Sequence, residues 1–311
     1  FLSVGFVHAA EKVYVLENPY MSRTLAVKDG VLSTQQIVNK QAGTNLVPVS
    51  CQEFALRISE GTDKEGTDRI LTAKDFVVES VDKKFSSSIK SYRFRLKNKT
   101  HKLTVDVCYE LAEDNFYGHK YLEIISGKKV TLEKIDVESI AFEDAFQNYK
   151  LKLITARKSG GWKPGLGQPV YTTATATFWG MEFPGAFNTV EEGNTITCGY
   201  LRGRELLPNE RYTTYRSVVG MADDKNFIDD TFFCYIDRIR RRPARLQVQY
   251  NSWFDYGGRV SKETFAKSLR KVHDELVVRR GCRPLNAYVI DDGWQDKGKS
   301  VTWADTVWKI N

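Results

Sequence analysis

Residues 102–111 alternate strictly between apolar and polar side chains, and this period of two constrains the fold more than any other feature of the sequence. The apolar positions are Leu103, Val105, Val107, Tyr109 and Leu111. The positions between them are Thr104, Asp106, Cys108 and Glu110. Successive side chains of a strand point to opposite faces of its sheet, so the pattern predicts a half-buried β-strand.

The same alternation recurs from about residue 12 to residue 231, with little sign of helix. Residues 91–97 show it clearly, and residues 98–101 are typical of a hairpin turn between the two strands. Further predicted strands cover residues 120–125, 130–140, 171–178 and 195–201. Many short strands separated by turns indicate an antiparallel β-sandwich, which we assign to residues 11–238.

The pattern changes after Pro243. Residues 246–250 predict a strand, and a helix is expected to begin at the N-cap Ser261 and to end at Gly281. Residues 285–290 predict a second, buried strand. The apolar stripe of the helix comprises Phe265, Leu269, Val272 and Leu276. Strand, helix and strand in this order predict a βαβ unit with two parallel strands.

One βαβ unit cannot cover both faces of its own sheet. All-parallel sheets need helices on both sides or a closed barrel. We therefore expect residues 239–311 to be the incomplete start of a parallel α/β domain.

Four residues stand where the two predicted parallel strands end. Trp253 follows the first strand, and Asp291, Asp292 and Trp294 follow the second. Functional residues of parallel α/β folds gather at the carboxyl ends of the strands. Carboxylates can accept hydrogen bonds from sugar hydroxyls while an indole packs on the apolar face of the ring. Two alternatives stay open on these residues alone, a divalent metal held by the carboxylates and a plain helix N-cap.

The segments Tyr-Asn-Ser-Trp-Phe-Asp-Tyr (250–256) and Val-Ile-Asp-Asp-Gly-Trp (289–294) resemble the first two barrel strands of glycoside hydrolase family 36, in clan D. Gly-Gln-Pro-Val (167–170) followed by Phe-Trp-Gly-Met-Glu (178–182) is similar to the end of the β-sandwich that precedes that barrel. The resemblance implies a β-supersandwich, then a (β/α)8 TIM barrel whose first βαβ unit is present here, and then a C-terminal β domain. It also implies retaining hydrolysis of terminal α-linked galactose or N-acetylgalactosamine, with the choice of sugar left open.

The resemblance assigns roles to the four strand-end residues. It implies that Asp291 and Asp292 bind the hydroxyls at O4 and O6 of the sugar in the −1 subsite. Trp253 would form part of the apolar wall, and Trp294 would pack beside the pair. The family takes its nucleophile and acid/base from aspartates on later barrel strands, so we expect no catalytic residue within residues 1–311. The resemblance implies no cofactor and no metal, and we expect this fragment to be inactive.

Composition limits the partners. The net charge is +7, and five arginines fall within residues 238–245, but no nucleic-acid reader motif accompanies them. No stretch approaches the roughly 20 apolar residues of a membrane span. Residues 1–10 are typical of the tail of a signal peptide, which predicts a secreted or periplasmic protein. The five cysteines are widely spaced, which favours neither a metal knuckle nor a dense disulfide scaffold. A glycan is the expected partner, and oligomerisation is left open.

Two other functions compete with the glycosidase. One is a protein that binds carbohydrate without hydrolysing it. The other is a galactosyltransferase of the raffinose-synthase type, which shares the barrel. A downstream Lys-x-Asp strand would favour an enzyme, and product analysis would separate hydrolase from transferase.

Overall fold

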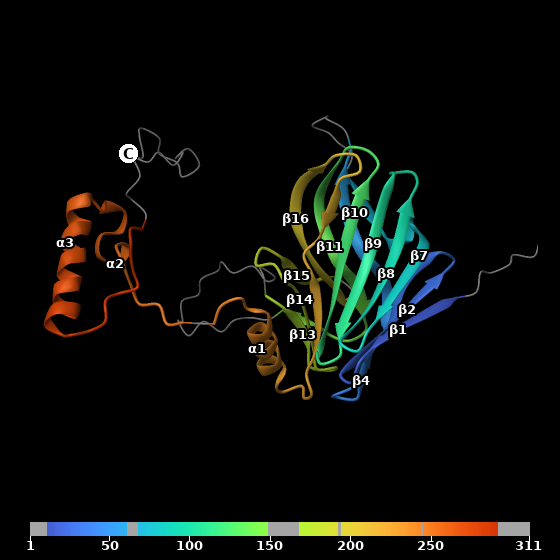
Figure 1. The fold of residues 1–311 in the computed structure, drawn as a ribbon, viewed down its shortest axis with the longest axis horizontal. Helices are drawn as coiled ribbons and strands as arrows, with labels where there is room; N and C mark the ends of the chain where they lie inside the picture. Colours follow the sequence, from blue (N-terminus) through green and yellow to red (C-terminus); the bar gives the residue numbers. More distant parts are fainter. Residues whose placement is uncertain (1–10, 61–67, 149–167, 192–193, 244, 292–311) are drawn as a thin grey trace, which may run out of the picture. The chain divides into compact units, whose positions relative to one another are not determined.

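The computed structural model describes residues 11–60, 68–148, 168–191, 194–243 and 245–291 (Figure 1). The chain divides into two compact units, Phe1–Ile239 (unit 1) and Arg240–Asn311 (unit 2). Residues 1–10, which carry the predicted signal remnant, lie outside the described residues.

Unit 1 is built from three sheets in which every described strand pair is antiparallel. The four-stranded sheet has the order β1 (Lys12–Glu17), β2 (Met21–Lys28), β3 (Val31–Asn39), β4 (Thr44–Leu46). The five-stranded sheet has the order β15 (Phe187–Glu191), β16 (Thr195–Leu206), β11 (Val130–Phe142), β5 (Pro48–Ser59), β6 (Arg69–Thr72). The antiparallel sandwich predicted for this part of the chain is confirmed.

The nine-stranded sheet is the largest (Figure 1). Its order is β12 (Gln147–Asn148), β13 (Val170–Thr172), β14 (Thr177–Met181), β18 (Ser217–Met221), β10 (Tyr117–Ser126), β9 (Leu103–Ala112), β8 (Ile89–Asn98), β7 (Val77–Phe85). A short strand, β17 (Arg211–Thr213), also pairs with β10. Strands distant in sequence are therefore neighbours in this sheet, as β10 and β18 are.

The β8–β9 hairpin follows the sequence pattern closely. Asn98 pairs with Leu103, and the backbone N–H of His101 donates to Oδ1 of Asn98 at 2.9 Å, which closes the turn. The five apolar residues of the predicted face are at most 1% exposed. They face the other two sheets and form a single apolar core with them. The predicted half-buried strand is thus confirmed, although Asp106 and Cys108 on its other face are also buried.

A buried network of charged side chains lies inside this apolar core. Arg23 of β2 donates to the Glu138 carboxylate of β11 at 2.8 and 3.1 Å. Lys120 of β10 donates to Glu53 of β5 at 2.7 Å and to Glu138 at 3.1 Å, and the Tyr109 hydroxyl donates to Glu53 at 2.6 Å. Burial alone would raise the pKa of Glu53, but Lys120 and Arg23 hold it well below its usual range. The network therefore joins all three sheets through charge-assisted hydrogen bonds.

Two local predictions for unit 1 are wrong. The segment 171–178 is not one strand, because a turn over residues 173–176 separates β13 from β14 and Ala176 there adopts a φ of +52°. The all-strand prediction to residue 231 misses the helix α1 (Ile228–Ile239). Its apolar residues Ile228, Phe232 and Tyr235 recur at helical spacing and pack on the outer face of the nine-stranded sheet.

The described residues of unit 2 form two strands, β19 (Gln249–Asn251) and β20 (Ala287–Val289), with helical segments between them. These segments are α2 (Trp253–Tyr256), the 3₁₀ turn η3 (Gly257–Arg259), α3 (Lys262–His273) and the π-helical turn η4 (Asp274–Arg279). The strands pair in parallel, with Tyr250 opposite Tyr288. Residues 251–258, between the first predicted strand and the predicted helix, therefore include a short helix. The second strand is half-buried rather than buried, because the described residues of unit 2 form a sheet of only two strands.

Candidate functional site

The helix that connects the two parallel strands begins and ends as its sequence indicates. The Ser261 hydroxyl accepts from the backbone N–H of Thr264 at 3.2 Å, which caps α3. Gly281 follows η4 with a φ of +67°, and its N–H donates to the carbonyl of Val277 at 3.1 Å. The ring of Phe265 lies 6.1 Å from that of Tyr250, so this residue of the apolar stripe packs against β19, whereas Leu269 of the stripe is exposed. This connection places the carboxyl ends of both strands at the same edge.

Asn251 and Asp291 meet at this edge. The Nδ2 atom of Asn251 donates to Oδ2 of Asp291 at 2.8 Å. The Oδ1 atom of Asn251 accepts from the backbone N–H of Trp253 at 2.8 Å. One amide side chain therefore fixes both the carboxylate after β20 and the start of the segment that carries the indole.

Ser252 also links the ends of the two strands through hydrogen bonds. It is fully buried, and its hydroxyl accepts from the backbone N–H of Asp291 at 2.9 Å. Its own N–H donates to the carbonyl of Val289 at 3.0 Å. Sequence reasoning missed both Asn251 and Ser252, although short polar residues that bond to nearby backbone are typical of such turns.

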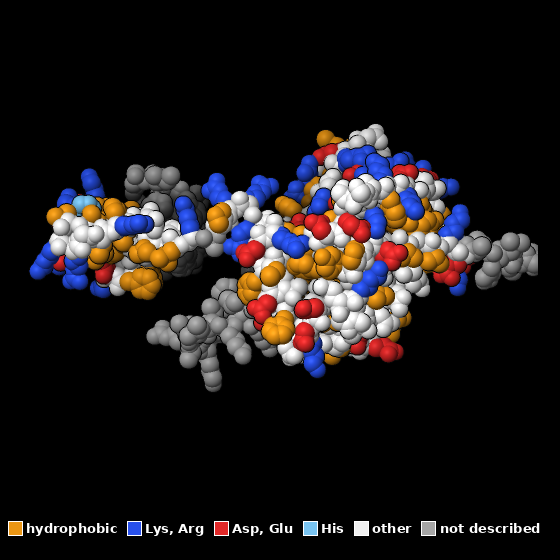
Figure 2. All heavy atoms as spheres, turned by 60° about the horizontal axis from the view of Figure 1, so that its bottom comes forward, with side chains coloured by type: hydrophobic (Ala, Val, Ile, Leu, Met, Phe, Trp, Pro, Cys, Tyr) orange, Lys and Arg blue, Asp and Glu red, His pale blue; other side chains and the backbone are white. Residues whose placement is uncertain are grey.

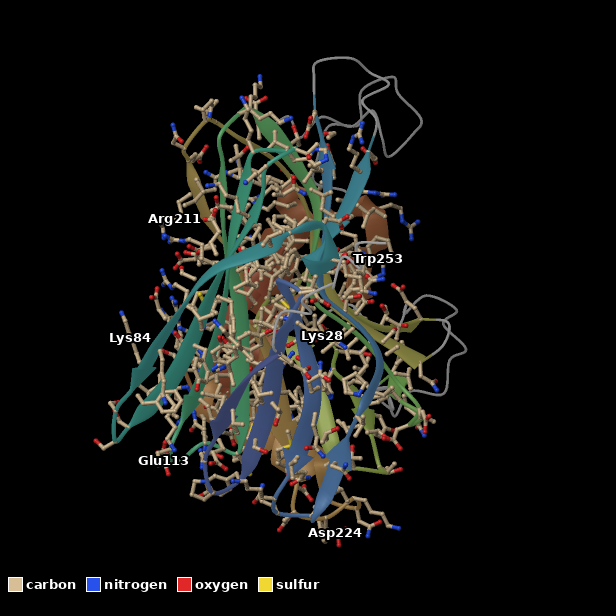
Figure 3. All side chains as sticks on the ribbon, turned by 90° about the vertical axis from the view of Figure 1, so that its right-hand side faces the viewer. Lys28, Lys84, Glu113, Arg211, Asp224 and Trp253 are labelled. Carbon is tan, nitrogen blue, oxygen red and sulfur yellow. The ribbon has the colours of Figure 1, made fainter. Side chains whose placement is uncertain are left out.

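The predicted site residues differ in how far the structure describes them. Trp253, labelled in Figure 3, begins α2 and is 48% exposed. Asp291 is half-buried and oriented by Asn251 and Ser252. Asp292 and Trp294 lie outside the described residues. The arrangement offers a fixed hydrogen-bond acceptor and an exposed aromatic side chain on neighbouring strand ends.

Another carboxylate near this edge is already engaged. The Tyr250 hydroxyl donates to Oδ2 of Asp255 at 2.6 Å. Burial and this bond raise the pKa of Tyr250. This hydrogen bond therefore links Asp255 of α2 to Tyr250 of β19.

Among the described residues, no three His, Cys, Asp or Glu side chains cluster so as to hold a metal ion. Asp292, one of the two strand-end carboxylates, lies outside them. All five cysteines are free thiols. In the part of the chain that the structure describes, no helix has the length and apolar character that a bilayer span requires.

Comparison with solved structures identifies the fold. The galactosidase domain of the α-galactosidase–sucrose kinase AgaSK is 13% identical with a TM-score of 0.57, over 92% of this chain and 50% of that one. The family 36 α-galactosidase AgaA of Geobacillus stearothermophilus is 12% identical with a TM-score of 0.56, over 92% and 51%. The α-galactosidase of Lactobacillus brevis is 9% identical with a TM-score of 0.52, over 91% and 49%.

The chain shares the fold of these α-galactosidases. It spans about half the length of each of them. The antiparallel sheets of unit 1 match the β-sandwich of family 36. No family model matches this sequence, and no curated protein matches it. One AgaA structure was solved in complex with stachyose, and another with 1-deoxygalactonojirimycin.

Proposed function

We propose that the chain is the N-terminal part of a retaining glycoside hydrolase that removes terminal α-linked galactose or N-acetylgalactosamine. The observation that carries the proposal is the bonded pair Asn251 and Asp291 at the carboxyl ends of two parallel strands, next to the exposed Trp253. Functional groups gather at this edge of parallel α/β barrels. The solved structures of similar fold add support, because they are α-galactosidases.

In this proposal β19, α3 and β20 begin a (β/α)8 barrel. Asp291 and Asp292 accept hydrogen bonds from the hydroxyls at O4 and O6 of the sugar. A carboxylate suits this role, because a hydrogen bond to a charged acceptor is stronger than one to a neutral acceptor. Trp253 forms an apolar wall against the ring, and Trp294 packs beside the carboxylates.

Hydrolysis of the bound sugar's glycosidic bond needs two further carboxyl groups. A retaining glycosidase places a nucleophile and an acid/base about 5–5.5 Å apart across the glycosidic bond. We assign both to aspartates of later barrel strands, so residues 1–311 bind the sugar and leave its bond intact. On the apolar run of residues 1–10 we further propose export from the cytoplasm.

The test uses the gene product that contains this chain and its downstream sequence. Asp291→Asn and Asp292→Asn keep the shape of each side chain and remove its charge. Each should lower kcat/KM on an aryl α-galactoside by about 30- to 150-fold, because a charged hydrogen bond contributes about 2–3 kcal/mol.

The matched control is Asp274→Asn, whose side chain is 71% exposed on η4. It should leave kcat/KM unchanged. Unchanged kcat/KM in both strand-end variants would refute the assignment of these carboxylates. Hydrolysis of the same substrate by purified residues 1–311 would refute the assignment of the catalytic pair.

A further inference from the structure

The outer face of the nine-stranded sheet has two parts of opposite character. Helix α1 covers one part, where Tyr117, Phe178 and Val218 pack against Tyr235. The open part lies over β7, β8, β9 and β10 and carries polar side chains. Lys84 and Arg211 project from this side of the sandwich in Figure 3.

A groove of about 210 Å³ crosses the open part. We call it the outer-face groove; it is lined by Asp82, Lys84, Ser91, Tyr92, Arg93, Cys108, Glu110 and Tyr121. Directly paired residues place Arg93, Cys108 and Tyr121 in one row across three strands. Because each comes from a strand interior, the groove is fixed by the ladder of the sheet and not by a loop.

Three polar side chains of the groove, those of Arg93, Glu110 and Tyr121, are held in place by bonds to one another or to neighbours. The Tyr121 hydroxyl donates to Glu110 at 3.1 Å, and Arg216 pairs with the same carboxylate at 3.1 Å. The guanidinium of Arg216 also lies 5.4 Å from the centre of the Tyr121 ring. Arg93 donates to Glu123 at 3.2 Å. Side chains fixed in this way lose little conformational freedom when a ligand binds.

The lining of the groove carries both signs of charge, and two of its charged side chains are already paired. Glu110 pairs with Arg216 and Arg93 with Glu123, so an ionic ligand of either sign would still meet one like charge, at Asp82 or at Lys84. A neutral ligand with many hydroxyls avoids both repulsions and can both donate and accept. Carboxylates, arginine and serine provide these partners, and the tyrosine ring provides a flat apolar contact.

The size of the groove points to a small ligand. Pockets for drug-sized molecules measure about 300–1,000 Å³, and this groove is smaller. We propose that the outer-face groove of unit 1 binds a single ring of a neutral saccharide. The role is recognition without reaction, and it does not depend on the function proposed for the strand ends of unit 2.

Isothermal titration of the gene product tests this with neutral methyl glycosides that an α-galactosidase does not cleave. The probes are methyl β-galactoside, methyl β-N-acetylgalactosaminide and methyl α-mannoside, with galacturonate and glucosamine as charged analogues. At least one neutral probe should show saturable binding, and both charged analogues should bind more weakly than it does.

Tyr121→Ala should weaken that binding at least tenfold. Asp82→Ala, a change at an exposed side chain that leaves the fold intact, should weaken it several-fold. The control is Phe227→Ala, since Phe227 is an exposed aromatic side chain elsewhere on unit 1. It should bind as the parent does, and Tyr121→Ala should keep the parent's kcat/KM on an aryl α-galactoside.

Three results would overturn the proposal. They are no saturable binding of any neutral probe, equal binding by the parent and both groove variants, and tighter binding of a charged analogue. Loss of binding in Trp253→Ala with retention in Tyr121→Ala would move the site to unit 2 and leave the function proposed there standing.

Discussion

Units 1 and 2 are stabilised by different kinds of interaction. Unit 1 encloses a core of some forty buried apolar side chains drawn from three sheets, with a charge network at its centre. Among the described residues of unit 2, the buried side chains are those of Ser252, Val260 and Ser268. Unit 2 takes its order from backbone pairing, helix caps and the Asn251 contacts instead.

The difference follows from the kind of sheet in each unit. Antiparallel sheets can leave one face to solvent, whereas a parallel sheet has to be covered on both faces. In unit 2, Leu246, Phe254 and Val278 are 86%, 88% and 68% exposed, and apolar side chains lie at its surface in Figure 2. Unit 1 therefore specifies its own structure, while unit 2 has apolar surface that further contacts would bury.

The largest expected effect comes from breaking the charge network of unit 1. Lys120→Met leaves Glu53 and Glu138 with Arg23 as their remaining cation. The free energy of unfolding should fall by about 3–5 kcal/mol, because removing one member of a buried ion pair strands the other. Urea denaturation followed by circular dichroism measures this.

The control for this variant is Lys40→Met, which breaks the exposed pair of Lys40 with Glu17. It should cost at most about 1 kcal/mol. Equal effects of the two variants would mean that the buried network does not distinguish unit 1.

A smaller effect is expected where α1 docks on the nine-stranded sheet. A Cβ at Gly220 would lie 2.0 Å from Cζ of Phe178, whose ring contacts Phe232 and Tyr235 of α1. Gly220→Ala should destabilise unit 1 by about 1–3 kcal/mol through overpacking. Hydrogen exchange should report faster opening of α1.

Gly118→Ala is the matched change on β10, because its Cβ would meet Met21 at an ordinary 3.5 Å. It should leave α1 protected. Equal exchange in the two alanine variants would show that α1 is not held by this contact.

In unit 2, Ser261→Ala removes the cap of α3. The helix should lose about 1 kcal/mol, since the cap satisfies an otherwise free N–H group. Amide exchange over residues 262–265 measures the fraying, and unit 1 should show no change. The control is Lys267→Ala, a change at an exposed side chain in the middle of α3. If this variant showed the same increase in amide exchange over residues 262–265, the cap would not be what stabilises the start of the helix.

The smallest expected effect is that of removing unit 2. A chain ending at Ile239 keeps the whole core of unit 1 and its α1 helix. Its free energy of unfolding should lie within about 1 kcal/mol of the value for unit 1 in the longer chain, as denaturant titration would report. A loss of several kcal/mol would show that unit 1 is not self-sufficient.

The sequence predicted the fold where the determining pattern is local. The β8–β9 hairpin follows from alternation and a turn within about twenty residues. Helix α1 was missed because its aromatic residues also suit a strand. The turn between β13 and β14 was missed because it contains neither glycine nor proline. The charge network was not predictable, because Lys120 and Glu138 become inward-facing only when three sheets meet.

For the candidate site, the structure tests position and not role. Strand-end placement singled out Trp253 and Asp291, and both follow the parallel strands β19 and β20; their role in binding a sugar stays a prediction. Asn251 carried no such signal, since its importance rests on a bond to a residue forty positions away. Roles for Asp292 and Trp294 remain predictions.

The position of β18 in the nine-stranded sheet sets an order of events during synthesis. β18 lies between β14 and β10, and Ser217 donates to the carbonyl of Lys120, 97 residues earlier. At about 5–20 residues per second, a ribosome delivers β18 roughly 5–20 s after β10. Throughout that interval the edge of β10 that later pairs with β18 has no partner strand there. Charged side chains on an open strand edge discourage pairing with other chains, and Lys120 supplies such a charge on β10.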